Sequence, residues 1–267
     1  MKAFRITISL TAIALLVFSL ARQVSAEEIS VVGTGSGAKI IEMLGDSFTK
    51  SNPDCKVLVP PSIGSGGGIK AVGTDQALIA RIARELKESE KEYGITYTPI
   101  LKLPIVFFVN KSVGIQNLSP QQACDIYSGK ITNWKDVGGP DADIRVIRRE
   151  DGDSSLEVLQ KKLPGFKDIT LTQKSKTTLS DPETCEMVQA KENTIAFGTY
   201  ANTKGMDLTV LKIDGKDPSD VSSYPYFGIL ALIYKEKNKT GNVGKLIDFA
   251  TSPEAKDVIL NAGGFPL

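Results

Sequence analysis

Short apolar segments alternate with helix-like segments along almost the whole chain, and this alternation limits the fold more than any other feature. Residues 29–32 are typical of a buried strand, and the segment that follows places Ile40, Ile41, Leu44 and Phe48 at helical spacing. The same change from strand to helix recurs as far as the C-terminal residues. The pattern predicts an α/β fold, and we expect mostly parallel sheets because a helix follows most strands.

Two apolar strands are candidates for links between separate lobes. Residues 103–109 and 224–229 form apolar runs, and the sequence has no internal repeat and no long flexible linker. A chain with two lobes then has to cross between them twice, through these strands. We therefore expect residues 27–104 and 225–267 to form one discontinuous lobe, and residues 105–224 the other.

The N-terminus has the layout of a cleaved secretory signal peptide. Lys2 and Arg5 precede an apolar run over residues 6–20, and small residues then precede an acidic pair. The apolar run is about 15 residues long, which is short of the ~20 residues that a membrane-spanning helix needs. We expect residues 1–26 to be removed by cleavage after Ala26. Because no cysteine in this segment offers a lipid anchor, the predicted location is the periplasm.

Charge and composition exclude several classes of function. Loss of residues 1–26 removes three cations and no acid, so the formal net charge falls from +1 to −2. This balance argues against a nucleic-acid partner, because such proteins need a concentrated basic face. The chain has no histidine, which excludes Cys–His zinc sites and Ser–His or Cys–His catalytic pairs. A hydrolase would need an unusual Ser–Lys or Asp-based site, so we expect no enzyme, no metal and no cofactor.

The three cysteines have no CxxC spacing. Cys55, Cys124 and Cys185 are far apart in the sequence, and an oxidising compartment allows one disulfide among them. The sequence alone does not indicate which pair would form it, or whether any pair does.

Three loops rich in glycine and serine each follow a predicted strand and open a predicted helix. They span residues 33–37, 62–68 and 148–155. The N–H groups of a first helical turn are unpaired and carry partial positive charge, and glycine lets the backbone approach a ligand closely. The hydroxyls of Ser36, Ser65 and Ser155 add donors, and Arg149 adds a cation. Together the loops predict an oxyanion site. The spacing of the first two matches neither the dinucleotide fingerprint nor the P-loop.

Several segments resemble the phosphate-binding proteins of ABC transporters. Residues 63–70 look like the second binding loop of that family, and residues 118–134 are close to its most specific signature. Residues 146–152 are similar to the strand and arginine of its third loop. Residues 252–255 and 264–267 resemble its C-terminal end. The resemblance covers essentially the whole chain after the signal peptide.

The resemblance implies a type II periplasmic binding protein, with two α/β lobes joined by two crossover strands. Such a protein captures an oxyanion, here inorganic phosphate as the first expectation, and delivers it to the membrane permease of an ABC transporter. It also implies a monomer. A sensor or scavenger with the same fold and a non-phosphate ligand is the alternative, and the sequence does not separate the two roles.

The resemblance also implies which residues of this chain form the site. They are Gly35, Ser36, Ser65, Gly66, Arg149, Asp153, Ser154 and Ser155. In the family the first loop supplies backbone N–H groups, the second a serine, and the third an arginine.

Two positions depart from the family pattern. The aspartate that accepts the proton of bound hydrogen phosphate falls at Ala83, and the third loop has Asp153 where the family has serine. A carboxylate beside an anion in a dry site costs several kcal/mol. Asp153 can accept the ligand's proton in place of Ala83. It can instead neutralise Arg149 when the lobes are open, which makes a weak site, or recognise a cationic or hydroxylated part of a ligand other than phosphate. Structurally, an N-cap on an exposed loop is the commonest role of aspartate before a helix.

Four further residues have ordinary structural interpretations. We expect Arg81 and Arg84 to be solvated charges beside nearby glutamates. Trp134 and Tyr127, in the signature segment, are expected to be packing residues.

Overall fold

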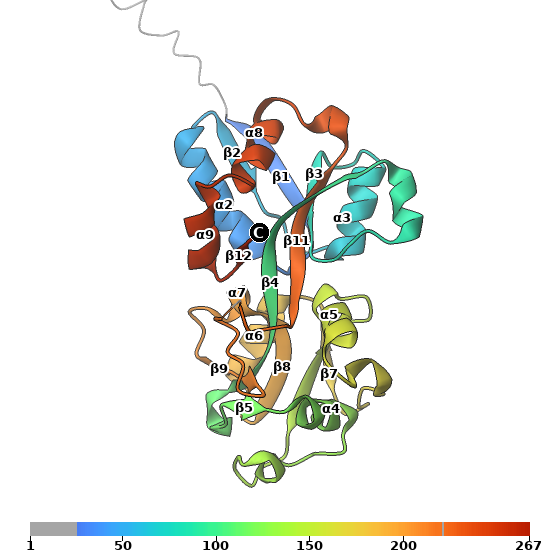
Figure 1. Cartoon of the computed structure of the whole chain (residues 1–267), viewed down its shortest axis with the longest axis vertical. Coiled ribbons are helices and arrows are strands. Elements are labelled where there is room, and N and C mark those ends of the chain that lie inside the picture. The colour runs from blue at the N-terminus through green and yellow to red at the C-terminus, as the bar shows by residue number, and fades with distance from the viewer. Residues whose placement is uncertain (1–25, 221) are drawn as a thin grey trace, which may run out of the picture.

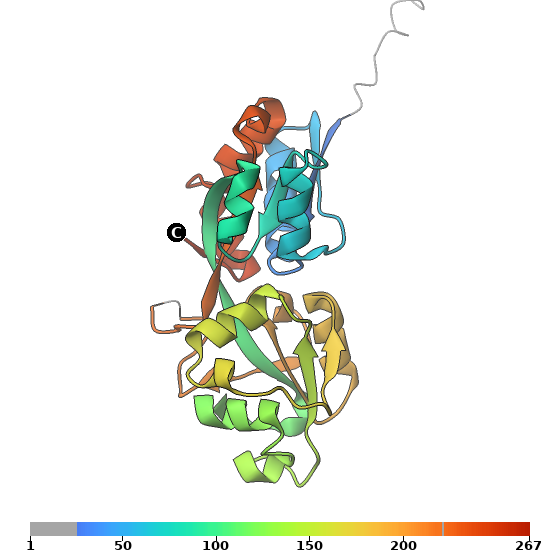
Figure 2. The ribbon, with the colours of Figure 1, turned by 90° about the vertical axis from the view of Figure 1, so that its right-hand side faces the viewer.

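The computed structural model describes residues 26–220 and 222–267 and shows two lobes stacked along the long axis of the molecule (Figure 1). The predicted signal peptide, except its last residue, lies outside the described residues. The two lobes, joined by two long strands, are also clear in the perpendicular view (Figure 2). The fold is α/β and two-lobed, as the sequence predicted.

The upper lobe of Figure 1 is formed from both ends of the chain. It contains β1 (Glu27–Gly33), α2 (Ala38–Ser51), β2 (Cys55–Leu58), α3 (Gly64–Gly73), β3 (Ile79–Ile82), α8 (Gly241–Ala250), α9 (Ala255–Ala262) and β12 (Phe265–Pro266). The short 3-10 helices η1 (Glu88–Tyr93) and η5 (Glu236–Asn238) complete it.

The lower lobe is formed from the middle of the chain. It contains β5 (Asn117–Leu118), α4 (Pro120–Ser128), β6 (Arg145–Arg149), α5 (Ser154–Lys162), β7 (Lys176–Thr178), α6 (Asp181–Ala190), β8 (Thr194–Thr199), β9 (Leu208–Val210) and β10 (Lys212–Ile213). Its 3-10 helices are η2 (Lys111–Val113), η3 (Trp134–Val137) and η4 (Phe166–Asp168). The short helix α7 (Tyr200–Thr203) lies at the junction of the lobes.

The strands β4 (Thr96–Asn110) and β11 (Phe227–Tyr234) run between the lobes and are antiparallel to each other. The strand order of the resulting sheet is β2-β1-β3-β11-β4-β8-β6-β7. Its two outer parts are parallel, whereas β11 is antiparallel to β3 and β4 is antiparallel to β8. The prediction of mostly parallel sheets is therefore wrong for the centre. The chain leaves the upper lobe on β4 and returns on β11, so these strands have opposite directions.

Each lobe buries its own apolar core. Leu103 on β4 packs in the core of the upper lobe, and Ile105, two residues later, packs in the core of the lower lobe. On the return, Tyr226 belongs to the lower core and Leu230 to the upper core. The single tryptophan, Trp134, is fully buried in the lower core, as expected for a packing residue.

Local sequence signals placed several helices correctly. Ile40, Ile41, Leu44 and Phe48 are all buried on one face of α2, as their spacing predicted. In α4 the Ser119 hydroxyl accepts a hydrogen bond from the Gln122 N–H, and Pro120 is the first helical residue. This capping box is the arrangement that the Ser-Pro pair indicates.

The helix α3 begins earlier than expected. It starts at Gly64, so the glycine-rich segment forms its first turns rather than a loop before Ile69. A Cβ atom on Gly68 would lie 3.0 Å from the Gly33 Cα, so only glycine permits this close packing of α3 on β1.

Two further observations concern the state of the cysteines and the length of the helices. Cys55, Cys124 and Cys185 are free and buried. Within the described part of the chain, no helix has the length and apolar character needed to cross a membrane.

Candidate functional site

The first and third predicted loops meet between the lobes. Ser36 lies in the turn between β1 and α2 of the upper lobe, and Ser154 and Ser155 form the first turn of α5 in the lower lobe (Figure 1). The Ser154 hydroxyl donates to the Ser36 Oγ over 3.1 Å, and the Oγ atoms of Ser36 and Ser155 are 3.5 Å apart. All three side chains are buried. Hydroxyl groups from both lobes therefore converge on one point.

Backbone donors surround the same point. Gly35 is buried, and within residues 26–220 and 222–267 its N–H has no hydrogen-bond acceptor. In that part of the chain, the N–H groups of Ser154 and Ser155 in the first turn of α5 also have no hydrogen-bond acceptor. A Cβ atom on Gly35 would lie 3.7 Å from the Asp181 N, so the first loop also touches the start of α6. Unpaired N–H groups at a helix start are suited to hold an anion.

The second loop lies against the first. The Ile63 N–H donates to the Gly33 carbonyl over 3.0 Å. Ser65 is buried in the first turn of α3, and its Oγ accepts from the Ala83 N–H over 3.3 Å. Gly66 is exposed, and a Cβ atom on it would lie 3.8 Å from Arg84 Nη2. Of these two predicted site residues, only Ser65 faces the protein interior.

Arg149, at the end of β6, is enclosed by carboxylates. Its Nη2 lies 3.1 Å from Asp153 Oδ2, and its Nε lies 3.2 Å from Glu150 Oε2. Its Nη1 donates to Asp181 Oδ1, which is fully buried. Three acidic groups therefore neutralise the buried cation of the third loop.

Asp181 is a site residue that the sequence analysis missed. It is the first residue of α6, and its Oδ2 accepts hydrogen bonds from Thr199 Oγ1 over 2.9 Å and from Asn202 Nδ2 over 3.0 Å. The only signal in the sequence was an acidic residue after Ser180 at a helix start, which is common to many helices. Nothing in that pattern indicates that the carboxylate faces Arg149.

Asp153 is an N-cap, as expected, but it is not exposed. Its Oδ1 accepts from the Leu156 N–H over 3.0 Å, while only 7% of the residue's surface is accessible because the start of α5 faces the other lobe. Burial raises the pKa of Asp153 to about 7, and the neighbouring Asp181 contributes in the same direction, against the lowering effect of Arg149. Asp153 contacts Arg149 while the lobes are in contact, whereas the second interpretation given for this residue concerns the open state.

The prediction that Arg81 and Arg84 are solvated is wrong. Arg81 is 0% exposed, because β3 lies between two other strands of the sheet and is covered on both faces. Burial lowers the pKa of Arg81 to about 10. The Arg84 side chain is 10% exposed, and its Nη1 lies 2.7 Å from Glu90 Oε2.

Ion pairs connect the lobes beside Ala83. Glu157 on α5 lies 3.8 Å from the Arg84 Nε and 3.6 Å from the Lys87 Nζ. These groups, together with Ala83 and Phe227, line a space of about 300 Å³ between the lobes. The methyl side chain of Ala83 offers no hydrogen-bond acceptor to this space.

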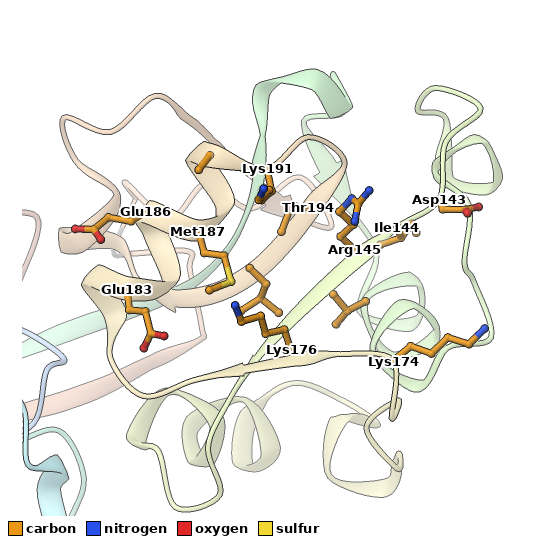
Figure 3. Close-up of a pocket in the computed structure, with 13 residues that line it drawn as sticks. Asp143, Ile144, Arg145, Lys174, Lys176, Glu183, Glu186, Met187, Lys191 and Thr194 are labelled. Carbon is orange, nitrogen blue, oxygen red and sulfur yellow. The ribbon is translucent and has the colours of Figure 1, made fainter.

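A larger cavity, of about 720 Å³, lies entirely within the lower lobe. Figure 3 shows Glu183 and Met187 of α6 on one side of the lining, Arg145 and Lys174 on the other, and Lys176 between them. No predicted site residue lines it. It is lined by β6 as far as Ile147, whereas Arg149 ends that strand, about 7 Å further along at ~3.3 Å per residue.

In residues 26–220 and 222–267 no group of three or more His, Cys, Asp or Glu side chains is placed to hold a metal ion.

A sequence profile assigns the chain to a known protein family. The sequence profile of the PBP superfamily domain matches residues 21–254. The chain belongs to the PBP superfamily. The two-lobed fold with a site between the lobes agrees with that membership.

Relatives of this PBP superfamily chain include named phosphate-binding proteins. The phosphate-binding protein PstS of Borreliella burgdorferi is 25% identical, over 93% of this chain and 93% of its own length. The phosphate-binding protein PstS of Bacillus subtilis is 22% identical, over 90% of this chain and 80% of its own length. The resemblance that the binding-loop motifs indicated is thereby confirmed.

Solved structures give the same result. A phosphate-bound substrate-binding protein from Clostridium perfringens is 29% identical, covers 90% of this chain and 100% of its own, and has a TM-score of 0.82. An ABC-type phosphate transport receptor from Vibrio cholerae is 24% identical, covers 90% and 100% of the two chains, and has a TM-score of 0.67. The second likeness shows the fold alone.

Proposed function

We propose that this protein captures inorganic phosphate between its two lobes and delivers it to the membrane permease of an ABC transporter. The observation that carries the proposal is the convergence of Ser36 with Ser154 and Ser155, from opposite lobes, at unpaired N–H groups. The names of the relatives in Borreliella burgdorferi and Bacillus subtilis, and the phosphate bound in the Clostridium perfringens structure, support phosphate as the ligand.

The proposed protein is a monomeric, periplasmic binding protein without catalytic activity. One lobe comprises residues 27–104 and 225–267, and the other comprises residues 105–224. The change of apolar core between Leu103 and Ile105 supports this division. Residues 1–26 act as the signal peptide.

The proposed ligand contacts come from three loops. The set is Gly35, Ser36, Ser65, Gly66, Arg149, Asp153, Ser154 and Ser155. The N–H groups of the first loop and of α5 donate to the phosphate oxygens, and the serine hydroxyls complete the shell. The exposure of Gly66 makes it the weakest member of this set.

Asp153 takes the role of proton acceptor that Ala83 lacks. A carboxylate and a phosphate anion repel each other unless a proton lies between them. Hydrogen phosphate carries such a proton, and sulfate at neutral pH does not. The arrangement therefore favours phosphate over sulfate whenever Asp153 is ionised.

Isothermal titration calorimetry of residues 27–267 tests the proposal. Phosphate is titrated at two pH values, with sulfate as the control ligand. One-to-one binding is expected for phosphate, abolished in Arg149→Ala and weakened in Asp153→Ser. Arg148→Ala is the matched control, because Arg148 pairs only with the exposed Asp151, and it should bind as the wild type does.

Circular dichroism establishes that each variant is folded before titration. If the wild type gives no heat with phosphate at either pH, the proposal is rejected and the ligand is another oxyanion. Turnover of a phosphate ester would contradict the non-catalytic role.

A further inference from the structure

Arg81 is a buried cation without an acidic partner. Its side chain is fully buried, yet within the described residues no carboxylate lies within ion-pair distance of it. Buried charges are normally paired, because their removal from water costs several kcal/mol. A cation that is buried without an acidic partner indicates a function for the charge itself.

The Arg81 guanidinium donates only to backbone carbonyls. Its Nε donates to the Thr34 oxygen over 2.7 Å, its Nη2 donates to the Pro60 oxygen over 2.9 Å, and its Nη1 donates to the Val31 oxygen. Thr34 precedes Gly35 in the first loop, and Pro60 leads into the second. One side chain therefore holds the entrances to two of the three binding loops.

The contact with Thr34 reaches the anion site through one peptide group. The Thr34 carbonyl and the Gly35 N–H belong to the same peptide bond, which is trans like every described peptide bond. In a trans peptide the carbonyl and the N–H point in opposite directions. The Gly35 N–H therefore points away from Arg81, and it is one of the buried donors without an acceptor in the described part of the chain.

The backbone of Arg81 fixes the preceding peptide group, between Gly33 and Thr34. The Thr34 N–H donates to the Arg81 carbonyl over 3.1 Å. Main chain and side chain of Arg81 thus hold both polar groups of Thr34. The orientation of the Gly35 N–H is set before any ligand arrives.

Charge balance gives Arg81 a second role. Asp153, Glu150 and Asp181 neutralise Arg149, so Arg149 contributes little net positive charge to the site. Among the described residues Arg81 has no carboxylate within ion-pair distance, and Glu42 acts on its charge only from further away. A cation on a carbonyl oxygen polarises the peptide and makes its N–H a stronger donor, because hydrogen bonds in series reinforce one another.

We infer that Arg81 is a positioning residue for anion binding, which aims and polarises the Gly35 N–H toward the oxyanion. Through this peptide it supplies the positive charge that the carboxylates around Arg149 remove. The inference rests on the proposed function, since it assigns a role in the same site.

Two variants of residues 27–267 test the inference. Arg81→Met removes the charge, and Arg81→Lys keeps it but cannot reach all three carbonyls. Phosphate affinity is measured by calorimetry at pH 5.5, where the monoanion dominates, and at pH 8, where the dianion dominates. We expect Arg81→Met to bind at least ~10-fold more weakly than the wild type, with a larger loss at pH 8, and Arg81→Lys to be intermediate.

The pH difference separates this role from a structural one. Loss of a nearby cation weakens dianion binding more than monoanion binding, whereas simple loosening of the loops weakens both equally. Lys235→Met is the matched control, because it removes a lysine of the same lobe that pairs with Asp75. The control should keep the wild-type affinity at both pH values. Wild-type affinity and a wild-type pH profile in folded Arg81→Met would overturn the inference.

A second measurement does not depend on phosphate. The amide resonance of Gly35 in the ligand-free protein reports the polarisation of its peptide group, and its ¹⁵N shift should move upfield in Arg81→Met but not in Lys235→Met. An unmoved resonance rejects the role of Arg81 even if phosphate binds. A moved resonance in a protein that does not bind phosphate rejects the proposed ligand and leaves the role of Arg81 standing.

Discussion

Asp153 combines a helix cap with a charge that an anion site would ordinarily exclude. It caps α5 through the Leu156 N–H and contacts Arg149, and both partners favour its ionised form. Burial has the opposite and larger effect, so the pKa of Asp153 rises to about 7. At neutral pH the residue is therefore close to its titration midpoint, where it can either accept or donate a proton.

The raised pKa predicts how stability depends on pH. The folded protein holds the Asp153 proton up to about pH 7, whereas the unfolded chain releases it near pH 3.8. The folded state binds more protons in that window, so the contribution of Asp153 to stability is full at low pH and is lost as the pH rises. Relative to Asp153→Asn, the ligand-free wild type should lose up to about 4 kcal/mol of unfolding free energy between pH 4 and pH 7.

Urea unfolding at a series of pH values measures this difference. Asp151→Asn is the control, because Asp151 is exposed and pairs only with Arg148 at the surface. A stability difference between the wild type and Asp153→Asn that does not change with pH would contradict the assignment of this proton.

At the scale of single residues, sequence patterns identified the hydroxyl groups but not the charges. Ser36 and Ser155 lie in glycine-rich loops, which are local signals. Asp181 is 32 residues from Arg149 in the chain, so only the tertiary fold brings the two together. Arg81 looked like a surface charge because charged residues usually are, and its burial follows from the central position of β3.

Among the elements, α5 links ligand capture to lobe closure. Its first turn carries Ser154 and Ser155, and one turn later Glu157 contacts Arg84 and Lys87 of the other lobe. A movement of α5 toward the upper lobe therefore shortens two sets of distances together: those from its serines to Ser36, and those of the ion pairs of Glu157. The ion pairs are partly exposed, so they should contribute about 1 kcal/mol or less.

Glu157→Gln should therefore weaken phosphate binding by only ~2–5-fold at low salt. The effect should disappear at high salt, because salt screens exposed ion pairs. Calorimetry at two ionic strengths checks this, with Glu186→Gln on the exposed face of α6 as the control. A loss that persists at high salt would mean that Glu157 acts by some means other than these ion pairs.

The order of elements was predictable where signals are local, and less so where they are not. The apolar spacing of α2 and the Ser119 cap of α4 are properties of a few consecutive residues. The antiparallel centre of the sheet was missed because the directions of β4 and β11 depend on how the chain crosses between lobes. The early start of α3 was missed because glycine normally disfavours helix, and here close packing on Gly33 requires it.

For the whole molecule, the lobes are in contact across the site. The hydroxyl contact between Ser36 and Ser154 places the structure on the closed side of any opening motion. In a protein of this architecture the ligand favours whichever arrangement it contacts from both lobes. Changes at the crossing strands should therefore alter affinity without touching the ligand.

Gly228 on β11 is the clearest position for such a change. A Cβ atom there would lie 3.1 Å from the Ala83 oxygen of the upper lobe and 3.1 Å from Val158 Cγ2 of the lower lobe. Gly228→Ala should act as a wedge that opposes closure and weakens phosphate binding by roughly tenfold, or about 1.4 kcal/mol. Calorimetry measures the affinity, and small-angle X-ray scattering measures the radius of gyration with phosphate present.

The fluorescence of the buried Trp134 serves as the control for this variant. An unchanged emission spectrum shows that the lower lobe keeps its core. Wild-type affinity in Gly228→Ala would contradict the view that closure at this crossing limits binding.

A crystal structure of residues 27–267 grown with phosphate tests the central claim most directly. The account predicts one phosphate ion between the lobes, within hydrogen-bond distance of the Gly35 N–H and of the Ser36 and Ser155 hydroxyls. A phosphate ion bound instead in the lower-lobe cavity beside Lys174 and Lys176, with the space between the lobes unchanged, would contradict it.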